Sequence, residues 1–230
     1  MDRVVIITGS TRGIGFAAAQ RFLKEGDKIV VLCRHRSHVI NAMRRLAEGI
    51  GPDDRIIGFK CDVGSSWDVK KVIEKTLKKW DRIDILVNNA GEAIYKPLEE
   101  INVRKFKRIV STNLKGVFLF TKQTLPAMKA QKEGVIINIS SELGFRGQKN
   151  YSAYSATNFA IVGFTESMAD ELLDTGIKVY SLHPGGVATD MYFEMHPEAR
   201  PEELIAPGQI ADVIFDMAKG IKPTGSKIEV

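Results

Sequence analysis

The sequence has few cysteines and no long apolar run, and each deficit disfavours a class of protein. Its 230 residues include two cysteines, Cys33 and Cys61, and neither belongs to a Cys-x-x-Cys pair. A disulfide framework or a zinc cluster is therefore disfavoured, and a reducing cytoplasm fits best. No stretch approaches the roughly 18 uninterrupted apolar residues of a membrane span, and no signal-peptide core is visible. We expect a soluble, cytoplasmic protein without a membrane partner.

The sequence also lacks a strong charge imbalance. Lys and Arg total 33 and Asp and Glu total 28, so the formal net charge is +5. The basic residues are dispersed and are not interleaved with aromatic residues, which disfavours a nucleic-acid partner. His183 and His196 have no partner at metal-ligand spacing, so we expect no metal site and interpret both as structural or exposed residues.

Short β-branched runs alternate with longer helical patterns along the chain. The expected strands are residues 4–8, 28–32, 55–60, 83–87, 135–140 and 178–182, with a last brief run at 226–230. The expected helices are residues 13–25, 36–49, 66–80, 102–130, 152–174 and 208–219. The strands are nearly continuously apolar, as in a parallel sheet covered on both faces. The alternation predicts an α/β fold, a doubly wound parallel sheet in three αβα layers, formed by residues 1–230 as a single domain.

Ligands of such sheets bind outside the carboxyl ends of the strands, so the residues after each strand are candidate site residues. The first expected strand leads into Thr8-Gly9-Ser10-Thr11-Arg12-Gly13-Ile14-Gly15 and then into a helix. Glycines at this place allow a pyrophosphate to approach the N–H groups at the start of the helix. Glycine also occurs in ordinary turns, so the main support for a pyrophosphate site is the position of these glycines between a strand and a helix.

The second strand lacks the acidic residue that commonly follows it and binds the ribose 2′-hydroxyl of NAD, since the next acidic residue is Glu48. Arg34 and Arg36 follow this strand instead, and Arg12 lies in the Gly-rich turn. Guanidinium groups bind phosphates bidentately, so Arg12 and Arg34 favour the 2′-phosphate of NADP over NAD. The alternative is that these arginines are solvated surface charges.

The next three strands end in polar or small residues. Asp62, in the pair Asp62-Val63, either accepts a hydrogen bond from an adenine amino group or caps the helix that begins near Ser65. The fourth strand ends in Asn88-Asn89-Ala90-Gly91, which suits a bound cofactor and also suits a turn. The fifth ends in Ser140-Ser141, and Tyr154 and Asn158 follow on one face of a helix.

Together with Asn113 and Pro184-Gly185, these motifs resemble the classical short-chain dehydrogenase/reductase family in order and spacing, from Val4 to about Thr189. The resemblance implies a Rossmann-like fold that transfers a hydride between NADP(H) and a carbonyl or alcohol substrate. The catalytic positions that it implies are Asn113, Ser141, Tyr154 and Asn158. The cofactor-binding residues that it implies are Gly9, Ser10, Arg12, Gly13, Ile14, Gly15, Arg34, Asp62, Val63, Asn89, Ala90, Gly91, Tyr154, Asn158, Pro184, Gly185, Val187 and Thr189. It also implies that the helices near 102–130 and 152–174 pair between subunits, in a homodimer or homotetramer.

The sequence departs from the family at one catalytic position. The family usually has Tyr-x3-Lys, whereas Asn158 stands four residues after Tyr154. A tyrosine with a pKa near about 10 is a poor base at neutral pH, and a nearby ammonium favours the phenolate. We therefore expect impaired catalysis, whether the change is engineered, compensated by another group or a sign of lost activity. The alternative function is a non-catalytic NADP-binding or sensing protein.

Substrate selection is expected in the segment after Asp190. Met191, Tyr192, Phe193 and Met195 are apolar, and prolines bound the segment that runs to Pro207. As a short lid at about 190–207, it would favour a moderately hydrophobic substrate. The alternative is an amphipathic helix that packs on the domain.

Overall fold

Seven parallel strands form one sheet in the computed structural model, which describes residues 2–48 and 54–230. The strand order is β3-β2-β1-β4-β5-β6-β7. The strands are β1 (Val4–Ile7), β2 (Lys28–Cys33), β3 (Ile56–Lys60), β4 (Ile85–Asn88), β5 (Gly134–Ile139), β6 (Ile177–His183) and β7 (Lys227–Glu229). The order reverses between β1 and β4, and such a switch point is where open α/β sheets bind ligands.

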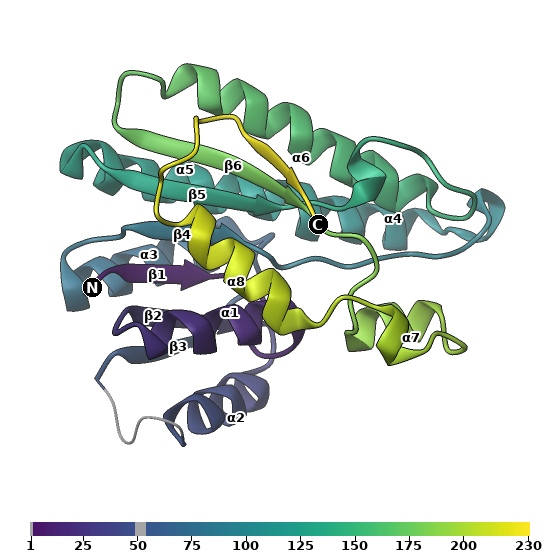
Figure 1. Cartoon of the computed structure of the whole chain (residues 1–230), viewed down its shortest axis with the longest axis horizontal. Coiled ribbons are helices and arrows are strands. Elements are labelled where there is room, and N and C mark those ends of the chain that lie inside the picture. The colour runs from purple at the N-terminus through teal and green to yellow at the C-terminus, as the bar shows by residue number, and fades with distance from the viewer. Residues whose placement is uncertain (1, 49–53) are drawn as a thin grey trace.

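Helices cover both faces of the sheet, as the continuous apolar strands require (Figure 1). They are α1 (Gly13–Lys24), α2 (Arg36–Ala47), α3 (Ser66–Trp80), α4 (Val103–Val110), α5 (Gly116–Gln131), α6 (Ser152–Glu171), α7 (Asp190–Met195) and α8 (Pro207–Met217). In the central strand β1, Val5 and Ile7 face the core under α1, α2 and α8, whereas Ile6 faces the core under α3, α5 and α6. The predicted Rossmann-like, three-layer fold is therefore confirmed.

Two expected elements differ from the structure for local reasons. The helix expected at 102–130 divides into α4, a π-helical turn at Ser111–Lys115, and α5. The strand expected to begin at residue 83 begins at Ile85, because the backbone N–H and carbonyl of Ile83 bond the side-chain amide of Gln131. Residue 49, the expected end of the second helix, lies outside the described residues.

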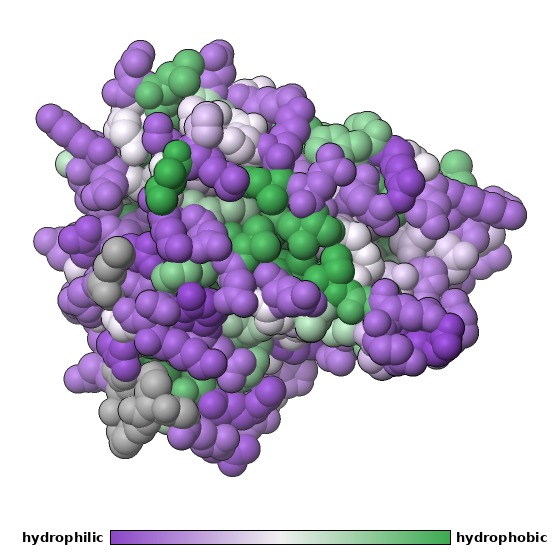
Figure 2. All heavy atoms as spheres, viewed as in Figure 1, coloured by the Kyte–Doolittle hydropathy of each residue, from purple (hydrophilic) through white to green (hydrophobic). Residues whose placement is uncertain are grey.

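The face of the molecule seen in Figure 2 is mostly hydrophilic. Figure 2 shows polar side chains over most of one face, with apolar side chains gathered near its centre beside α8. No helix in the described part of the chain is long and apolar enough to cross a membrane.

Candidate active site

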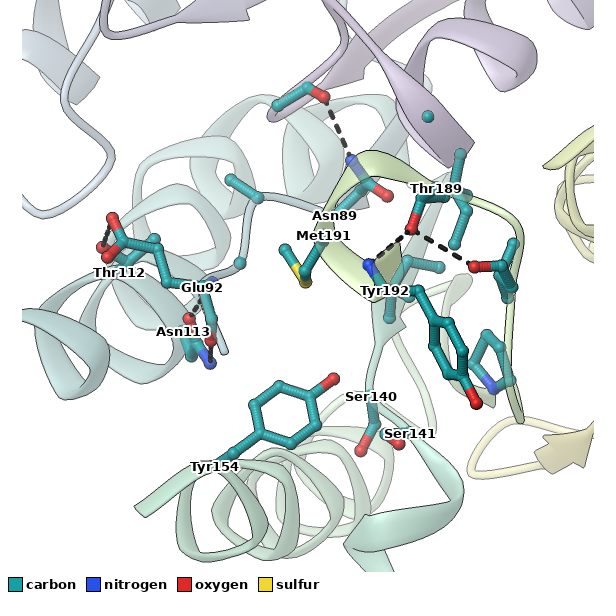
Figure 3. Close-up of a pocket in the computed structure, with 18 of the residues that line it drawn as sticks. Asn89, Glu92, Thr112, Asn113, Ser140, Ser141, Tyr154, Thr189, Met191 and Tyr192 are labelled. Carbon is teal, nitrogen blue, oxygen red and sulfur yellow. Dashed lines mark hydrogen bonds between the residues drawn. The ribbon is translucent and has the colours of Figure 1, made fainter. Parts of the chain in front are cut away.

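A cavity of about 380 Å³ opens at the carboxyl ends of the strands (Figure 3). The segments that follow β1, β2, β4, β5 and β6 line it, together with side chains of α6 and α7. The predicted site residues that line this cavity are Gly9, Arg12, Gly13, Ile14, Arg34, Val63, Asn89, Ala90, Gly91, Asn113, Ser141, Tyr154, Asn158, Pro184, Gly185, Val187 and Thr189. Segments far apart in the sequence thus converge on one site.

The Gly-rich turn packs against the segment that follows β4. Gly9 has a φ of 67°, and a Cβ there would lie 2.9 Å from the Cα of Ala90. A Cβ on Gly15 would lie 2.5 Å from the side-chain amide nitrogen of Asn89. The Thr8 hydroxyl accepts hydrogen bonds of 2.9 Å from the backbone N–H groups of Asn89 and Ala90. These close approaches leave no room for a side chain at either glycine.

Ser10, Gly15 and Asp62 do not line the cavity, although they were predicted as cofactor-binding residues. Ser10 is buried, and its hydroxyl donates to the carbonyl of Ile7 and accepts from the N–H of Leu32. The Asp62 carboxylate accepts from the N–H of Gly64. The alternative that Asp62 caps α3 is wrong, because Ser65 is the N-cap and accepts from the N–H of Asp68.

Both predicted phosphate-binding arginines form ion pairs with carboxylates. The Arg12 guanidinium lies 3.1 Å from Asp190 and 3.8 Å from Glu194, at the start of α7 and along it. Arg34 Nη2 lies 2.8 Å from Oε1 of Glu92. Each side chain thus meets a carboxylate at the cavity, with 61% of the Arg12 side chain and 39% of the Arg34 side chain exposed.

Ser141 and Tyr154 meet at the other end of the cavity. Ser141 follows β5, and Tyr154 lies in the first turn of α6 with its hydroxyl directed toward Ser140 and Ser141 (Figure 3). Burial raises the pKa of Tyr154 above its ordinary value, while hydrogen bonding to Ser141 and Asn158 lowers this pKa by less. The phenol therefore stays protonated at neutral pH.

Asn158 occupies the position one turn beyond Tyr154. Its side chain is 2% exposed, and its amide donates to the backbone carbonyl of Tyr154 at 2.9 Å. The Ser140 hydroxyl lies 3.3 Å from the side-chain oxygen of Asn158. No lysine is among the described residues that line the cavity, and the arginines that line it are Arg12 and Arg34.

Asn113 lies in the π-helical turn and binds the backbone rather than the cavity centre. Its side-chain oxygen accepts from the N–H of Glu92 at 2.8 Å, and its amide donates to the carbonyl of Glu92 at 2.9 Å. The same amide also donates to the hydroxyl of Thr157 on α6 at 3.2 Å. Asn113 thereby connects the segment after β4 to α6, and π turns of this kind often occur at functional sites.

His196, which was expected to be a structural or exposed residue, lies with its ring at the wall of the cavity. His196 Nε2 lies 2.6 Å from the hydroxyl of Tyr151, and its ring contacts those of Tyr95 and Tyr192. Burial raises the pKa of Tyr151 to about 12. No sequence spacing connects Tyr151 and His196, so the pair becomes visible only when the residue before α6 meets the residue after α7 in the folded chain.

His183 is a buried structural residue, as predicted. Its ring lies between the hydroxyl of Ser181 at 2.8 Å and the backbone carbonyl of Ser141 at 3.2 Å, and burial lowers its pKa. Among the described residues, no group of three or more His, Cys, Asp or Glu side chains is arranged to hold a metal ion.

The segment after β6 closes one side of the cavity. Thr189 caps α7 by accepting from the N–H of Tyr192, and Met191, Tyr192 and Met195 line the cavity. Gly186 lies so close to this segment that a Cβ there would be 2.9 Å from Leu204. Residues of α7 therefore form part of the wall of the cavity.

Known proteins share this fold. Residues 3–199 match the short chain dehydrogenase family. A 3-oxoacyl-[acyl-carrier-protein] reductase of Synechocystis sp. is 37% identical over 196 residues, which cover 85% of this chain and 78% of that protein. The structure of ElxO with NADP bound superposes with a TM-score of 0.91 and 28% identity over 100% of this chain and 97% of that chain. A 3-ketoacyl-(acyl-carrier-protein) reductase from Brucella melitensis complexed with NADH gives a TM-score of 0.89 and 29% identity over 99% and 96%.

Proposed function

The chain belongs to the short chain dehydrogenase family of oxidoreductases, and on that basis we propose that it transfers a hydride between NADP(H) and a carbonyl or alcohol substrate. The observation that carries the proposal is the convergence of the Gly-rich turn, Ser141 and Tyr154 on one cavity. Nucleotide-binding and proton-transferring groups are thereby within reach of one small molecule.

The residues of the cavity suit a nicotinamide nucleotide. Gly9, Gly13 and the start of α1 would hold a pyrophosphate, and Asn89 would hold the adenosine ribose. Val187 and Thr189 would contact the nicotinamide end, and Val63 would contact the adenine. The similar structures hold NADP in one case and NADH in another, so the family accommodates both. A bound nicotinamide would supply the hydride.

Arg12 and Arg34 support NADP as the preferred nucleotide. Both guanidinium groups lie at the cavity, and each can exchange a carboxylate partner for a phosphate. We propose that they bind the 2′-phosphate.

The proton chemistry falls to Tyr154 and Ser141. Tyr154 would donate its proton to the substrate oxygen during reduction, and Ser141 would donate a hydrogen bond as charge develops there. The phenolate left on Tyr154 meets no lysine among the described cavity residues, and Asn158 carries no charge. We therefore propose that turnover is impaired near neutral pH in both directions.

The second candidate function is non-catalytic NADP binding or sensing. It is favoured by Asn158, whose amide is satisfied by Tyr154 and Ser140 and gives the phenolate no cation. This function predicts nucleotide binding without turnover on any substrate, so the same assay separates the two.

We propose that residues 190–207 act as a short lid within a single domain of residues 1–230. Met191, Tyr192 and Met195 give the cavity an apolar wall, which supports a moderately hydrophobic substrate. The free thiols of Cys33 and Cys61 are in keeping with the reducing cytoplasm.

We propose a homodimer or homotetramer formed through α4, α5 and α6. The described surfaces of these helices expose Phe106, Phe118 and Phe159, the last to 47%. Large exposed aromatic side chains on adjoining helices are typical of a protein interface rather than of a monomer surface.

The function is tested by titrating the protein with NADPH and NADH and then measuring turnover on reactive ketones and aldehydes. We expect tighter binding of NADPH and slow, measurable reduction. Tyr154→Phe, the matched control, should bind NADPH normally and lose that reduction. Turnover that is unchanged by Tyr154→Phe would contradict the proposed role of the phenol, and preferential NADH binding would contradict the role of the arginines.

A further inference from the structure

The carboxylate of Glu92 forms ion pairs with two arginines from different parts of the fold. It follows β4, and its Oε1 lies 2.8 Å from Nη2 of Arg34, which follows β2. Arg108 of α4 places its Nε 2.8 Å from Oε2 and 3.0 Å from Oε1 of the same carboxylate. The carboxylate therefore occupies the position between two guanidinium groups that an anionic ligand would otherwise take.

The position of Glu92 is fixed from its backbone. Its N–H and carbonyl both bond the side chain of Asn113, at 2.8 Å and 2.9 Å, and the Thr112 hydroxyl lies 3.5 Å from Oε1. The Glu92 side chain is 24% exposed and lines the same cavity as Arg34. The Glu92–Arg34 pair is therefore a built contact of the cavity rather than a chance meeting of two mobile surface chains.

A phosphate monoester and a carboxylate bind guanidinium groups through the same kind of charge-assisted hydrogen bonds. We propose that Glu92 competes with the 2′-phosphate of the nucleotide for Arg34, and so sets how strongly the protein prefers NADPH to NADH. The inference rests on the proposed function, because it requires that the cavity bind these nucleotides with Arg34 at the 2′-phosphate.

The competition is selective because the two nucleotides differ only in that phosphate. NADH makes no demand on Arg34, so the Glu92–Arg34 pair can persist beside it. NADPH must draw Arg34 away and bring a dianion close to the carboxylate of Glu92. Arg108 makes this exchange possible, since Glu92 keeps one cationic partner when Arg34 turns to the phosphate.

The test is a fluorescence titration of Glu92→Gln with NADPH and with NADH, compared with the unaltered protein. Glutamine keeps the length of the side chain and removes the charge. Because the pair is partly exposed to solvent, we expect NADPH to bind about 5- to 10-fold more tightly and NADH to change by less than about twofold. Glu74→Gln, which removes the same charge from a pair with Lys70 on α3, is the matched control and should leave the ratio unchanged.

Two further variants keep the proposal testable if Glu92→Gln folds poorly. Arg108→Gln removes the other partner of Glu92, strengthens its hold on Arg34 and should weaken NADPH binding relative to NADH. In an Arg34→Gln background, the Glu92→Gln change should no longer favour NADPH selectively, because the contested cation is gone.

The outcomes divide clearly. An unchanged NADPH-to-NADH ratio in Glu92→Gln, with NADH binding retained, would overturn the role of Glu92 and leave the proposed function standing. An equal gain for both nucleotides would overturn it as well, because the effect would then be one of general charge. If the unaltered protein binds neither nucleotide, the proposed function itself fails, and the inference with it.

Discussion

Replacing Asn158 by lysine restores a positive charge beside Tyr154. Position 158 faces the cavity one helical turn beyond the tyrosine, and the asparagine there is almost fully buried. Burial is the largest influence on the pKa of Tyr154 and raises it, and the hydrogen bonds from Ser141 and Asn158 do not offset this. An ammonium in the same pocket stabilises the phenolate directly, so Asn158→Lys should lower the pKa of Tyr154.

The size of the effect follows from the linkage between pKa and rate. An opposite charge within about 4–6 Å lowers a pKa by about 1–3 units, and each unit corresponds to about 1.4 kcal/mol. Below the pKa of Tyr154, the phenolate fraction rises tenfold per unit, so we expect alcohol oxidation at pH 7 to accelerate about 10- to 1,000-fold. The substitution also removes the contacts of Asn158 with Ser140 and Tyr154, which should lower the free energy of unfolding by about 1–3 kcal/mol.

The pH dependence gives the sign of the effect independently of its size. Oxidation needs the phenolate, so the rate of the unaltered protein should still be rising with pH at pH 9, because the pKa of Tyr154 is raised. In Asn158→Lys the rise should begin, and level off, at lower pH. Reduction needs the protonated phenol, so its loss at high pH should begin at lower pH in the variant.

The assay is steady-state turnover from pH 6 to 10, in both directions, with a panel of ketones, aldehydes and secondary alcohols. Asn158→Met is the matched control, because it adds a chain of similar length to lysine without the charge. The reasoning is refuted if Asn158→Met gains as much activity as Asn158→Lys, or if the pH profile of oxidation does not move in the lysine variant. No gain on any substrate would instead favour the non-catalytic function.

Three further predictions test the structure elsewhere. Asp27 is fully buried and accepts hydrogen bonds from the backbone N–H and the guanidinium of Arg3. Asp27→Ala should therefore lower the free energy of unfolding, measured in urea, by about 2–4 kcal/mol, and a decrease under about 1 kcal/mol would contradict this account. Burial raises the pKa of Cys61 to about 12, so at pH 8 iodoacetamide should label the half-buried Cys33 first. Because Cys33 lines the cavity, NADPH should slow its labelling, and mass spectrometry measures both effects. Phe159→Glu should dissociate the proposed oligomer without unfolding it, as light scattering and thermal melting would show.

The fold was predictable because its signals are periodic and local. Continuous β-branched runs identify strands covered on both faces, and their alternation with helical patterns leaves few topologies. The break at Ser111–Lys115 was not predictable, because it depends on a side chain, Asn113, that bonds the backbone of Glu92 in another segment. Likewise, Gln131 bonds the backbone of Ile83, where the period alone predicted strand.

The site was predictable where a motif follows a strand, and not where two distant segments meet. Ser141, which follows β5, and the glycines after β1 stand at such positions. Tyr151 precedes α6 and His196 follows α7, so only the folded chain brings them together, and no spacing in the sequence marks them as a pair. To predict a residue whose role depends on a contact, the position of the contacting residue must be known, and a single sequence does not give that position.

The number of arginines at the cavity overstates its affinity for phosphate, because each arginine already pairs with a carboxylate. A guanidinium attracts a phosphate in proportion to the field that remains after its own partners are included. Arg12 faces Asp190 and Glu194, and Arg34 faces Glu92, so a nucleotide phosphate must compete at both positions. A preference for NADP therefore depends on the difference between two anions at each guanidinium, and changing a carboxylate should shift it as effectively as changing an arginine.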